Sequence, residues 1–157
     1  MTPTMSNIAT LDDVRYQEHI LQGVSRTFAL TIPQLPPALR EVVGNAYLLC
    51  RIVDTVEDDS ALTLEQTREL AEMFIEVVSG TVEAETFARA LYPLLSEHTI
   101  PAEHDLIKHT PSVIRMTHSF NPVQRQALER CIRIMGQGMA AYQESACLSG
   151  LENQAEM

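Results

Sequence analysis

Apolar residues recur along most of this chain at intervals of three and four positions, which is the period of an α-helix. No long stretch alternates apolar and polar residues with period two, so no β-strands are expected. The pattern predicts helical segments over residues 11–23, 37–58, 63–80, 83–95, 102–119 and 122–145. The sequence therefore indicates an all-α fold of about five or six helices.

Capping signals mark the starts of two of these segments. Thr10 precedes Asp13 in the spacing of a capping box, and Thr63 precedes Gln66 in the same spacing. In such a box, each side chain accepts a hydrogen bond from the other residue's backbone N–H. Gly80 is placed to end the second of these helices, because glycine readily adopts the left-handed conformation of a C-terminal cap.

Prolines set several further boundaries. Pro37 and Pro122 stand where proline commonly begins a helix. Pro93 is expected to shorten one helix, and Pro111 to bend another, because proline lacks the N–H that a helix interior needs. The segment 25–35 is expected to be a turn-rich connection with one helical turn at most.

Composition narrows the class of protein. Of 157 residues, 45% are apolar, which is enough for one domain with a hydrophobic core. The chain has 11 Lys and Arg against 21 Asp and Glu, a net charge of 11 − 21 = −10. So acidic a chain is a poor ligand for nucleic acid or anionic lipid, so neither is expected as its main partner.

Targeting and redox signals point to the cytoplasm. No apolar run approaches the roughly 18–20 residues of a membrane span, and the N-terminus lacks the pattern of a secretory signal. The three cysteines, Cys50, Cys131 and Cys147, are an odd number without a C-x-x-C pair. Free thiols in a reducing compartment are the simplest interpretation.

One helical face carries the chemistry. Tyr47, Arg51, Asp54 and Asp58 are spaced by four, three and four residues, so they form one stripe, with Glu57 beside it. Acids at the C-terminal end of a helix oppose its macrodipole and cost about 0.3–1 kcal/mol each when exposed. A bound cation removes that cost. Carboxylates with an arginine one turn away suit Mg²⁺ together with a diphosphate.

Each of these features also has a plainer interpretation. The acids alone are compatible with a solvated helix end that runs into a loop. Tyr47 alone is compatible with a core tyrosine whose hydroxyl reaches the rim. Gly136 and Gly138 lie inside a predicted helix at a cost of about 1 kcal/mol each, so they indicate the close approach of a neighbouring helix or of a ligand chain.

Three segments together resemble the squalene/phytoene synthase family, whose members join two prenyl diphosphates head to head. They are SRTF at 25–28, YLLCRIVDTVEDD at 47–59 and MGQGMA at 135–140, and both their order and their spacing match. The acidic segment is more similar to squalene synthases than to phytoene synthases. The resemblance implies an all-α bundle of the isoprenoid synthase type, with residues 1–157 as the N-terminal portion of a single domain.

The resemblance also implies roles for individual residues. Asp54 and Asp58 are expected to be catalytic ligands of Mg²⁺, with Glu57 as a third ligand or a supporting neighbour. Arg51 is expected to bind diphosphate and the phosphates of NADPH. Tyr47 is expected to face the reacting carbons as a catalytic and substrate-binding residue. The other implied substrate contacts are Ser25, Arg26, Phe28, Met135, Gly138 and Met139, of which Arg26 is also expected to bind NADPH and Ser25 alternatively caps a turn.

The implied reaction converts two farnesyl diphosphates to presqualene diphosphate and then, with NADPH, to squalene. Phytoene or dehydrosqualene synthesis without NADPH is the alternative enzyme. A third possibility is a non-catalytic helical fragment that binds Mg²⁺-diphosphate or pairs with a partner half.

The family's second acidic motif, D-Y-x-E-D, has no match here. We therefore expect the N-terminal half of an enzyme that is cytoplasmic or peripheral to a membrane. The chain alone is expected to make no squalene and to self-associate or stay molten.

Overall fold

The computed structural model describes residues 9–149, without the side chains of Arg26, Phe28, Ala29, Pro33 and residues 139–149. All regular structure in this range is helical, which confirms the all-α prediction. The α-helices are α1 (Leu11–Val24), α2 (Arg26–Thr31), α3 (Pro37–Asp58), α4 (Leu64–Ser79), α5 (Ala84–Leu91), α6 (Pro101–Lys108), α7 (Thr110–Ser119) and α8 (Pro122–Ser149). Two 3-10 turns, η2 (Ile32–Gln34) and η3 (Tyr92–Leu94), follow α2 and α5.

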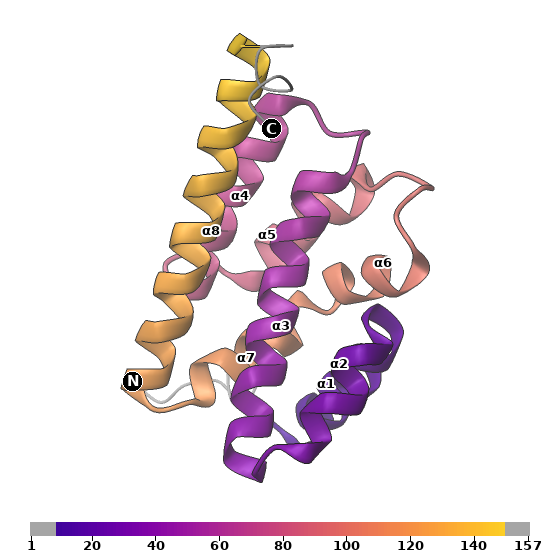
Figure 1. Ribbon diagram of the computed structural model, residues 1–157, viewed down its shortest axis with the longest axis vertical. Coiled ribbons are helices and arrows are strands. Elements are labelled where there is room, and N and C mark those ends of the chain that lie inside the picture. The colour runs from indigo at the N-terminus through magenta and orange to yellow at the C-terminus, as the bar shows by residue number, and fades with distance from the viewer. Residues whose placement is uncertain (1–8, 150–157) are drawn as a thin grey trace.

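Helix α3 is the centre of the fold. It contacts α1, α4, α6, α7 and α8, and in Figure 1 α8 runs beside it in the same direction. Its buried apolar residues are Leu48, Leu49, Ile52, Val53 and Val56. They join one core that includes Phe74 of α4 and Phe87 of α5, whose ring centroids lie 4.9 Å apart. Each helix contributes an apolar face to this core, as the three-and-four periodicity predicts.

A buried amide fixes the position of α3 against α7. Asn45 is fully buried, and its Nδ2 donates to the carbonyl oxygen of Val113 at 3.0 Å. The hydroxyl of Thr117 donates to Asn45 Oδ1 at 2.8 Å. Because each of these polar groups is satisfied by the other helix, a shift of α3 along α7 would leave buried groups unpaired.

The helix boundaries follow the local signals closely. The capping boxes at Thr10 and Thr63 are both formed, and Gly80 ends α4 with φ 97° in the left-handed region. Helix α3 spans the range predicted for it. Pro93 falls in η3, so it shortens α5 as expected.

Two expectations about helices were wrong. The chain breaks at His109 rather than bending at Pro111, because Pro111 lies at the start of a new helix and the Thr110 hydroxyl donates to Ile107 O at 2.6 Å. The connection over 25–35 forms both α2 and η2. These two differences give eight α-helices in the described range instead of five or six. Helix α8 begins at Pro122 as predicted and ends at Ser149, within four residues of the predicted end.

Among residues 9–149, no helix combines the length and the apolarity that crossing a bilayer requires.

Candidate functional site

The predicted stripe lies on the C-terminal half of α3. Tyr47, Arg51, Asp54 and Glu57 are each partly buried, and Asp58 is exposed. Tyr47 packs against the hydrophobic core, as a core tyrosine would, and stands at the apolar end of the stripe. One helix face therefore changes from an aromatic ring to a guanidinium and then to carboxylates, as the sequence spacing predicts.

The carboxylates of this stripe are close enough to repel one another. Burial, and then the charge of Asp58, raises the pKa of Asp54 above its ordinary value, while Arg51 opposes the shift. Burial, followed by the charges of Asp58 and Asp54, likewise raises the pKa of Glu57. Among the described residues, burial and mutual repulsion therefore disfavour the charged forms of Asp54 and Glu57, and a cation brought by a ligand would stabilise them.

Arg51 forms an ion pair with a residue distant in sequence. Its Nε lies 2.9 Å from Oε1 of Glu103, in the first turn of α6. The side chain of Arg51 is 29% exposed and that of Glu103 is 15% exposed. The pair is not an aligned hydrogen bond, because the buried Nε of Arg51 finds no acceptor in its N–H direction. Glu103 also acts on Asp54, whose pKa its charge raises further.

Asp59, the last acid of the run, has a different role from its neighbours. It is buried and accepts hydrogen bonds from the backbone N–H groups of Ala61 at 2.9 Å and Ser96 at 2.8 Å. The hydroxyl of Thr99 donates to it at 2.7 Å. Although burial raises the pKa of Asp59, these hydrogen bonds lower it below the ordinary value. Asp59 therefore ties the end of α3 to the segment before α6.

The donor set suits a magnesium ion that arrives with phosphate. In the described part of the chain, no three His, Cys, Asp or Glu side chains converge on a preformed metal position. Mg²⁺ does not need one, since it binds through one or two carboxylates and completes its shell with water and substrate phosphate. Asp54 and Asp58, one turn apart on α3, are carboxylates of the kind that such an ion binds, and a cation beside them would reduce their mutual repulsion.

Helix α8 reaches the level of the carboxylates. The Cys50 thiol of α3 lies within hydrogen-bonding reach of Cys131 of α8, and the two helices run in the same direction (Figure 1). Seven residues, or about two turns, further along each helix stand Glu57 and Gly138. A Cβ at Gly138 would meet no atom within 4 Å, so this position opens onto free space.

Two other members of the α8 motif, Met135 and Gly136, pack against the rest of the fold. A Cβ on Gly136 would lie 3.1 Å from Cδ1 of Ile75, so this glycine allows α8 to approach α4 closely. Met135 is partly buried against the core. The side chain of Met139 lies outside the described part of the structure. Helix packing therefore explains Gly136, and only Gly138 keeps the open surroundings expected of a ligand-facing position.

The SRTF segment is only partly visible. The backbone N–H of Ser25 donates to Leu21 O at 2.9 Å and so caps the end of α1. This bond uses only the backbone, so both roles considered for Ser25, capping a turn and donating to a phosphate, stay predictions. The side chains of Arg26 and Phe28 are outside the described residues, so their expected roles stay predictions.

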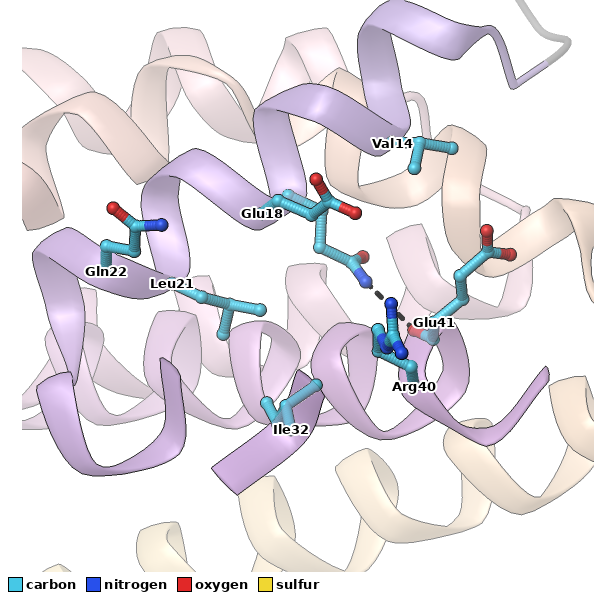
Figure 2. Close-up of a pocket in the computed structure, with 8 residues that line it drawn as sticks. Val14, Glu18, Leu21, Gln22, Ile32, Arg40 and Glu41 are labelled. Atoms are coloured by element: carbon cyan, nitrogen blue, oxygen red, sulfur yellow. Dashed lines mark hydrogen bonds between the residues drawn. The ribbon is translucent and has the colours of Figure 1, made fainter. Parts of the chain in front are cut away.

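A cavity of about 230 Å³ lies away from the predicted site (Figure 2). It is enclosed by α1, η2 and the first turns of α3, and none of the predicted site residues lines it. Gln17, one of its lining residues, is buried and donates from Nε2 to Glu41 O at 2.9 Å, the bond drawn dashed in Figure 2. Glu41 precedes Asp54 by 13 residues, which is about 20 Å along the helix.

The family model for squalene/phytoene synthase matches residues 21–148. The chain belongs to the squalene/phytoene synthase family. It is 31% identical over 130 residues to the squalene synthase of Schizosaccharomyces pombe, which covers 83% of this chain and 26% of that protein. It is also 31% identical over 129 residues to a lycopaoctaene synthase of Botryococcus braunii, which covers 82% of this chain and 27% of that enzyme. The chain thus spans about a quarter of the length of these relatives.

Solved structures agree with this family. The structure of TcSQS in complex with the ligand BPH1237 superposes with a TM-score of 0.71 at 26% identity, over 84% of this chain and 36% of that one. The complex of TcSQS with E5700 gives a TM-score of 0.70 at 27% identity, over 83% of this chain and 35% of that one. The family resemblance and the fold inferred from the three sequence motifs are both confirmed.

Sequence patterns did not reveal the contacts of two residues beside the predicted stripe, Glu103 and Asp59. Glu103 stands 52 positions after Arg51, and nothing in its own segment marks it as a partner of that arginine. Asp59 belongs to the acidic run, and nothing in the sequence distinguishes it from Asp58. Its structural role becomes evident only in the fold, where Ser96 and Thr99 donate hydrogen bonds to its carboxylate. From the sequence, Glu103 is considered only as an acid that could supply a second metal cluster if the chain alone proved active, and not as the ion-pair partner of Arg51.

Proposed function

We propose that this protein takes part in the head-to-head condensation of two farnesyl diphosphates to presqualene diphosphate and in its NADPH-dependent reduction to squalene. Membership of a prenyltransferase family supports the reaction class. The observation that carries the proposal is the unbalanced charge of Asp54 and Glu57 beside the guanidinium of Arg51. This surface suits a ligand that is itself a metal cation bound to a polyanion.

The proposed roles follow from the chemistry of each side chain. Asp54 and Asp58 hold Mg²⁺ with the help of Glu57, while Arg51 and Arg26 bind the diphosphate. A Mg²⁺ held there would neutralise charge on the leaving diphosphate and so would lower the barrier to breaking the allylic C–O bond. Tyr47 faces the resulting cation, which an aromatic ring attracts.

The prenyl chain is proposed to lie along α8 beside the carboxylates. Gly138 opens onto free space at the level of Glu57, and this is the support for a substrate contact there. The neighbouring methionines, Met135 and Met139, together with Phe28 and Ser25, are proposed to complete the substrate contacts. Thioether side chains suit this purpose because they are apolar and adapt their shape to a flexible chain.

NADPH is proposed to bind through Arg26 and Arg51, since the chain carries no glycine-rich dinucleotide motif. The alternative is a member of the family that needs no NADPH, such as a phytoene or dehydrosqualene synthase. The relatives leave room for different products, because one of them is a presqualene diphosphate synthase of Botryococcus braunii, 30% identical over 129 residues. A non-catalytic chain that binds Mg²⁺-diphosphate or pairs with a partner half is the other alternative.

We place the protein in the cytoplasm, where it would meet a prenyl diphosphate at or near a membrane surface. The free thiols of Cys50 and Cys131 support a reducing compartment. The net charge of −10 supports contact through the substrate rather than through anionic lipid headgroups.

A chimera tests this function. Residues 21–148 replace the matching segment of the Schizosaccharomyces pombe squalene synthase, and products from farnesyl diphosphate are analysed with and without NADPH. We expect squalene with NADPH and presqualene diphosphate without it. Asp54→Asn in the chimera should lower product formation about 100-fold or more. The control is Glu65→Gln, at an exposed acid in the first turn of α4, which lies within the transferred residues. Equal activity of the chimera and its Asp54→Asn variant would contradict the proposal.

A further inference from the structure

We infer that Glu103 is a positioning residue, which holds Arg51 away from Asp54 so that both stay available to the ligand. The inference rests on the proposed function and adds to it a residue on a second helix. It concerns how α6 prepares the site on α3 before any diphosphate or metal is bound.

Without Glu103, Arg51 has an obvious partner on its own helix. Asp54 lies three residues further along the same face of α3, at a spacing where opposite charges pair. The two groups already interact, since the charge of Arg51 lowers the pKa of Asp54. A direct Arg51–Asp54 ion pair would use the guanidinium meant for phosphate and the carboxylate meant for the metal.

In the structure, Arg51 is held elsewhere. Its Nε lies 2.9 Å from Glu103 Oε1, and the Glu103 side chain is 15% exposed, so this contact is largely shielded from water. Shielding strengthens an ion pair relative to one on the surface. Asp54 is also partly buried, yet it is Glu103 that the guanidinium of Arg51 contacts in the structure.

Helix α6 is a firm support for Glu103. Leu106 and Ile107, one turn further along, are fully buried. The hydroxyl of Tyr16 on α1 donates to Asp105 Oδ2 at 2.9 Å. Glu103 itself lies in the first turn of the helix, where the macrodipole favours a negative charge. These contacts hold helix α6 in place, and with it the position from which Glu103 reaches Arg51.

The geometry also leaves Arg51 free to bind an anion. The contact uses Nε, the inner nitrogen, and its N–H does not point at the Glu103 oxygen. We assign the two terminal nitrogens of the guanidinium to the diphosphate, which a planar fork of donors can bind through two oxygens.

If Glu103 positions Arg51, removing its charge should change the affinity for an anion in the direction opposite to that expected from charge repulsion alone. If Glu103 were only one more negative charge near the site, its removal would strengthen the binding of an anion. If it positions Arg51, its removal lets Arg51 pair with Asp54, and the binding of the anion weakens.

Calorimetry with inorganic diphosphate in the presence of Mg²⁺, on the 157-residue chain, separates these outcomes. We expect Glu103→Gln to weaken binding about fivefold, the scale of one partly exposed ion pair, and Glu103→Asp to restore part of the loss. The matched control is Glu85→Gln, which removes an equal charge from an exposed ion pair with Arg89. Unchanged or tighter binding by Glu103→Gln, with the melting temperature preserved, overturns the inference.

A second background shows whether Glu103 acts through Arg51. In Arg51→Ala, Glu103→Gln should no longer weaken diphosphate binding, and a loss that persists there also overturns the inference. If Arg51→Ala and Asp54→Asn bind diphosphate as tightly as the unsubstituted chain, or if that chain does not bind it, the proposed function fails and the inference fails with it. If those two substitutions weaken binding and Glu103→Gln does not, the inference alone fails.

Discussion

Arg115 of α7 binds Asp13 of α1 through two nitrogens, with Nε 2.9 Å from Oδ2 and a terminal nitrogen 2.8 Å from Oδ1. The Asp13 side chain is only 4% exposed, and the Ser112 hydroxyl donates to Oδ1 at 2.7 Å. The same carboxylate closes the capping box with Thr10. One aspartate thus begins α1 and joins it to a helix about 100 residues later in the chain.

This pair predicts a dependence of stability on pH. Burial raises the pKa of Asp13, but the hydrogen bonds from Arg115, Ser112 and Thr10 outweigh it and bring the pKa to about 2, below the ordinary 3.8. The stabilisation is therefore complete above about pH 4 and is lost as the pH falls toward 2. The shift corresponds to about 2 kcal/mol.

Asp13→Asn should accordingly lower the free energy of unfolding by about 2 kcal/mol at pH 7 and flatten the acid limb between pH 4 and 2. Urea denaturation at a series of pH values measures both effects. Asp12→Asn is the matched control, because Asp12 is exposed in the same helical turn. Equal losses in the two variants would show that the bond to Arg115 contributes no specific stability.

Cys50 on α3 and Cys131 on α8 should differ in their reactivity toward alkylating reagents. Burial, followed by the neighbouring Cys131 thiol and the charge of Asp54, raises the pKa of Cys50 to about 12, whereas Cys131 is exposed. Because the thiolate is the reactive form, iodoacetamide at pH 8 should modify Cys131 and spare Cys50 until the protein is unfolded. Mass spectrometry in a Cys147→Ser background checks this. Rapid labelling of Cys50 in the folded protein would mean that α8 does not cover it.

Replacement of Arg51 by lysine should not preserve function. An ammonium group cannot bind two phosphate oxygens through a planar fork, and it cannot keep the Nε contact with Glu103. In the chimera that carries residues 21–148, Arg51→Lys should lower kcat/KM roughly tenfold or more. The exposed Arg89, replaced by lysine, is the control. A kcat/KM near that of the control would indicate that Arg51 is a surface charge without a role in binding.

The chain by itself is expected to make no squalene and to self-associate. The chemistry needs two facing acidic clusters in a dry cavity, and this sequence carries one. The described residues already form a continuous core, so self-association is expected rather than a molten state. Large apolar side chains that remain exposed, among them Leu30, Val123 and Ile134, offer the contact surface. Light scattering after size exclusion should therefore show an oligomer. A monomer that converts farnesyl diphosphate to squalene would contradict this expectation.

Local chemistry explains how much of the fold was predictable. The capping boxes at Thr10 and Thr63 and the proline before α3 act within one turn, so the sequence alone places those helix starts within a residue. The break at His109, which separates α6 from α7, depends on how these two helices pack in the fold, and no local sequence pattern predicts that. A proline is compatible with both a bend and a break.

The candidate site likewise contains residues that the sequence pattern predicts and residues that only the fold brings together. Arg51, Asp54 and Asp58 share a face because helical spacing requires it, so the stripe was visible in the sequence. Glu103 joins it only because the fold brings α6 against α3. Gly136 and Gly138 looked equivalent in the sequence, and only the position of Ile75 shows that the first serves packing.

We propose that Asp54 and Asp58 serve to bind a metal-bound diphosphate, and that their negative charges lower the stability of the folded chain. Since burial and mutual repulsion raise the pKa of Asp54, its charged form destabilises the fold above that pKa. Replacing the charged carboxylate by an amide should therefore stabilise the folded chain and, at the same time, weaken its binding of the metal-bound diphosphate.

The most direct test measures both quantities on Asp54→Asn and Asp58→Asn at pH 7. We expect each variant to melt about 1–4 °C higher than the unsubstituted chain, and to lose most of its Mg²⁺-dependent binding of inorganic diphosphate. Asp59→Asn is the control, and it should melt lower, because Asp59 accepts three structural hydrogen bonds. Lower melting temperatures for Asp54→Asn and Asp58→Asn, with diphosphate binding unchanged, would contradict the account.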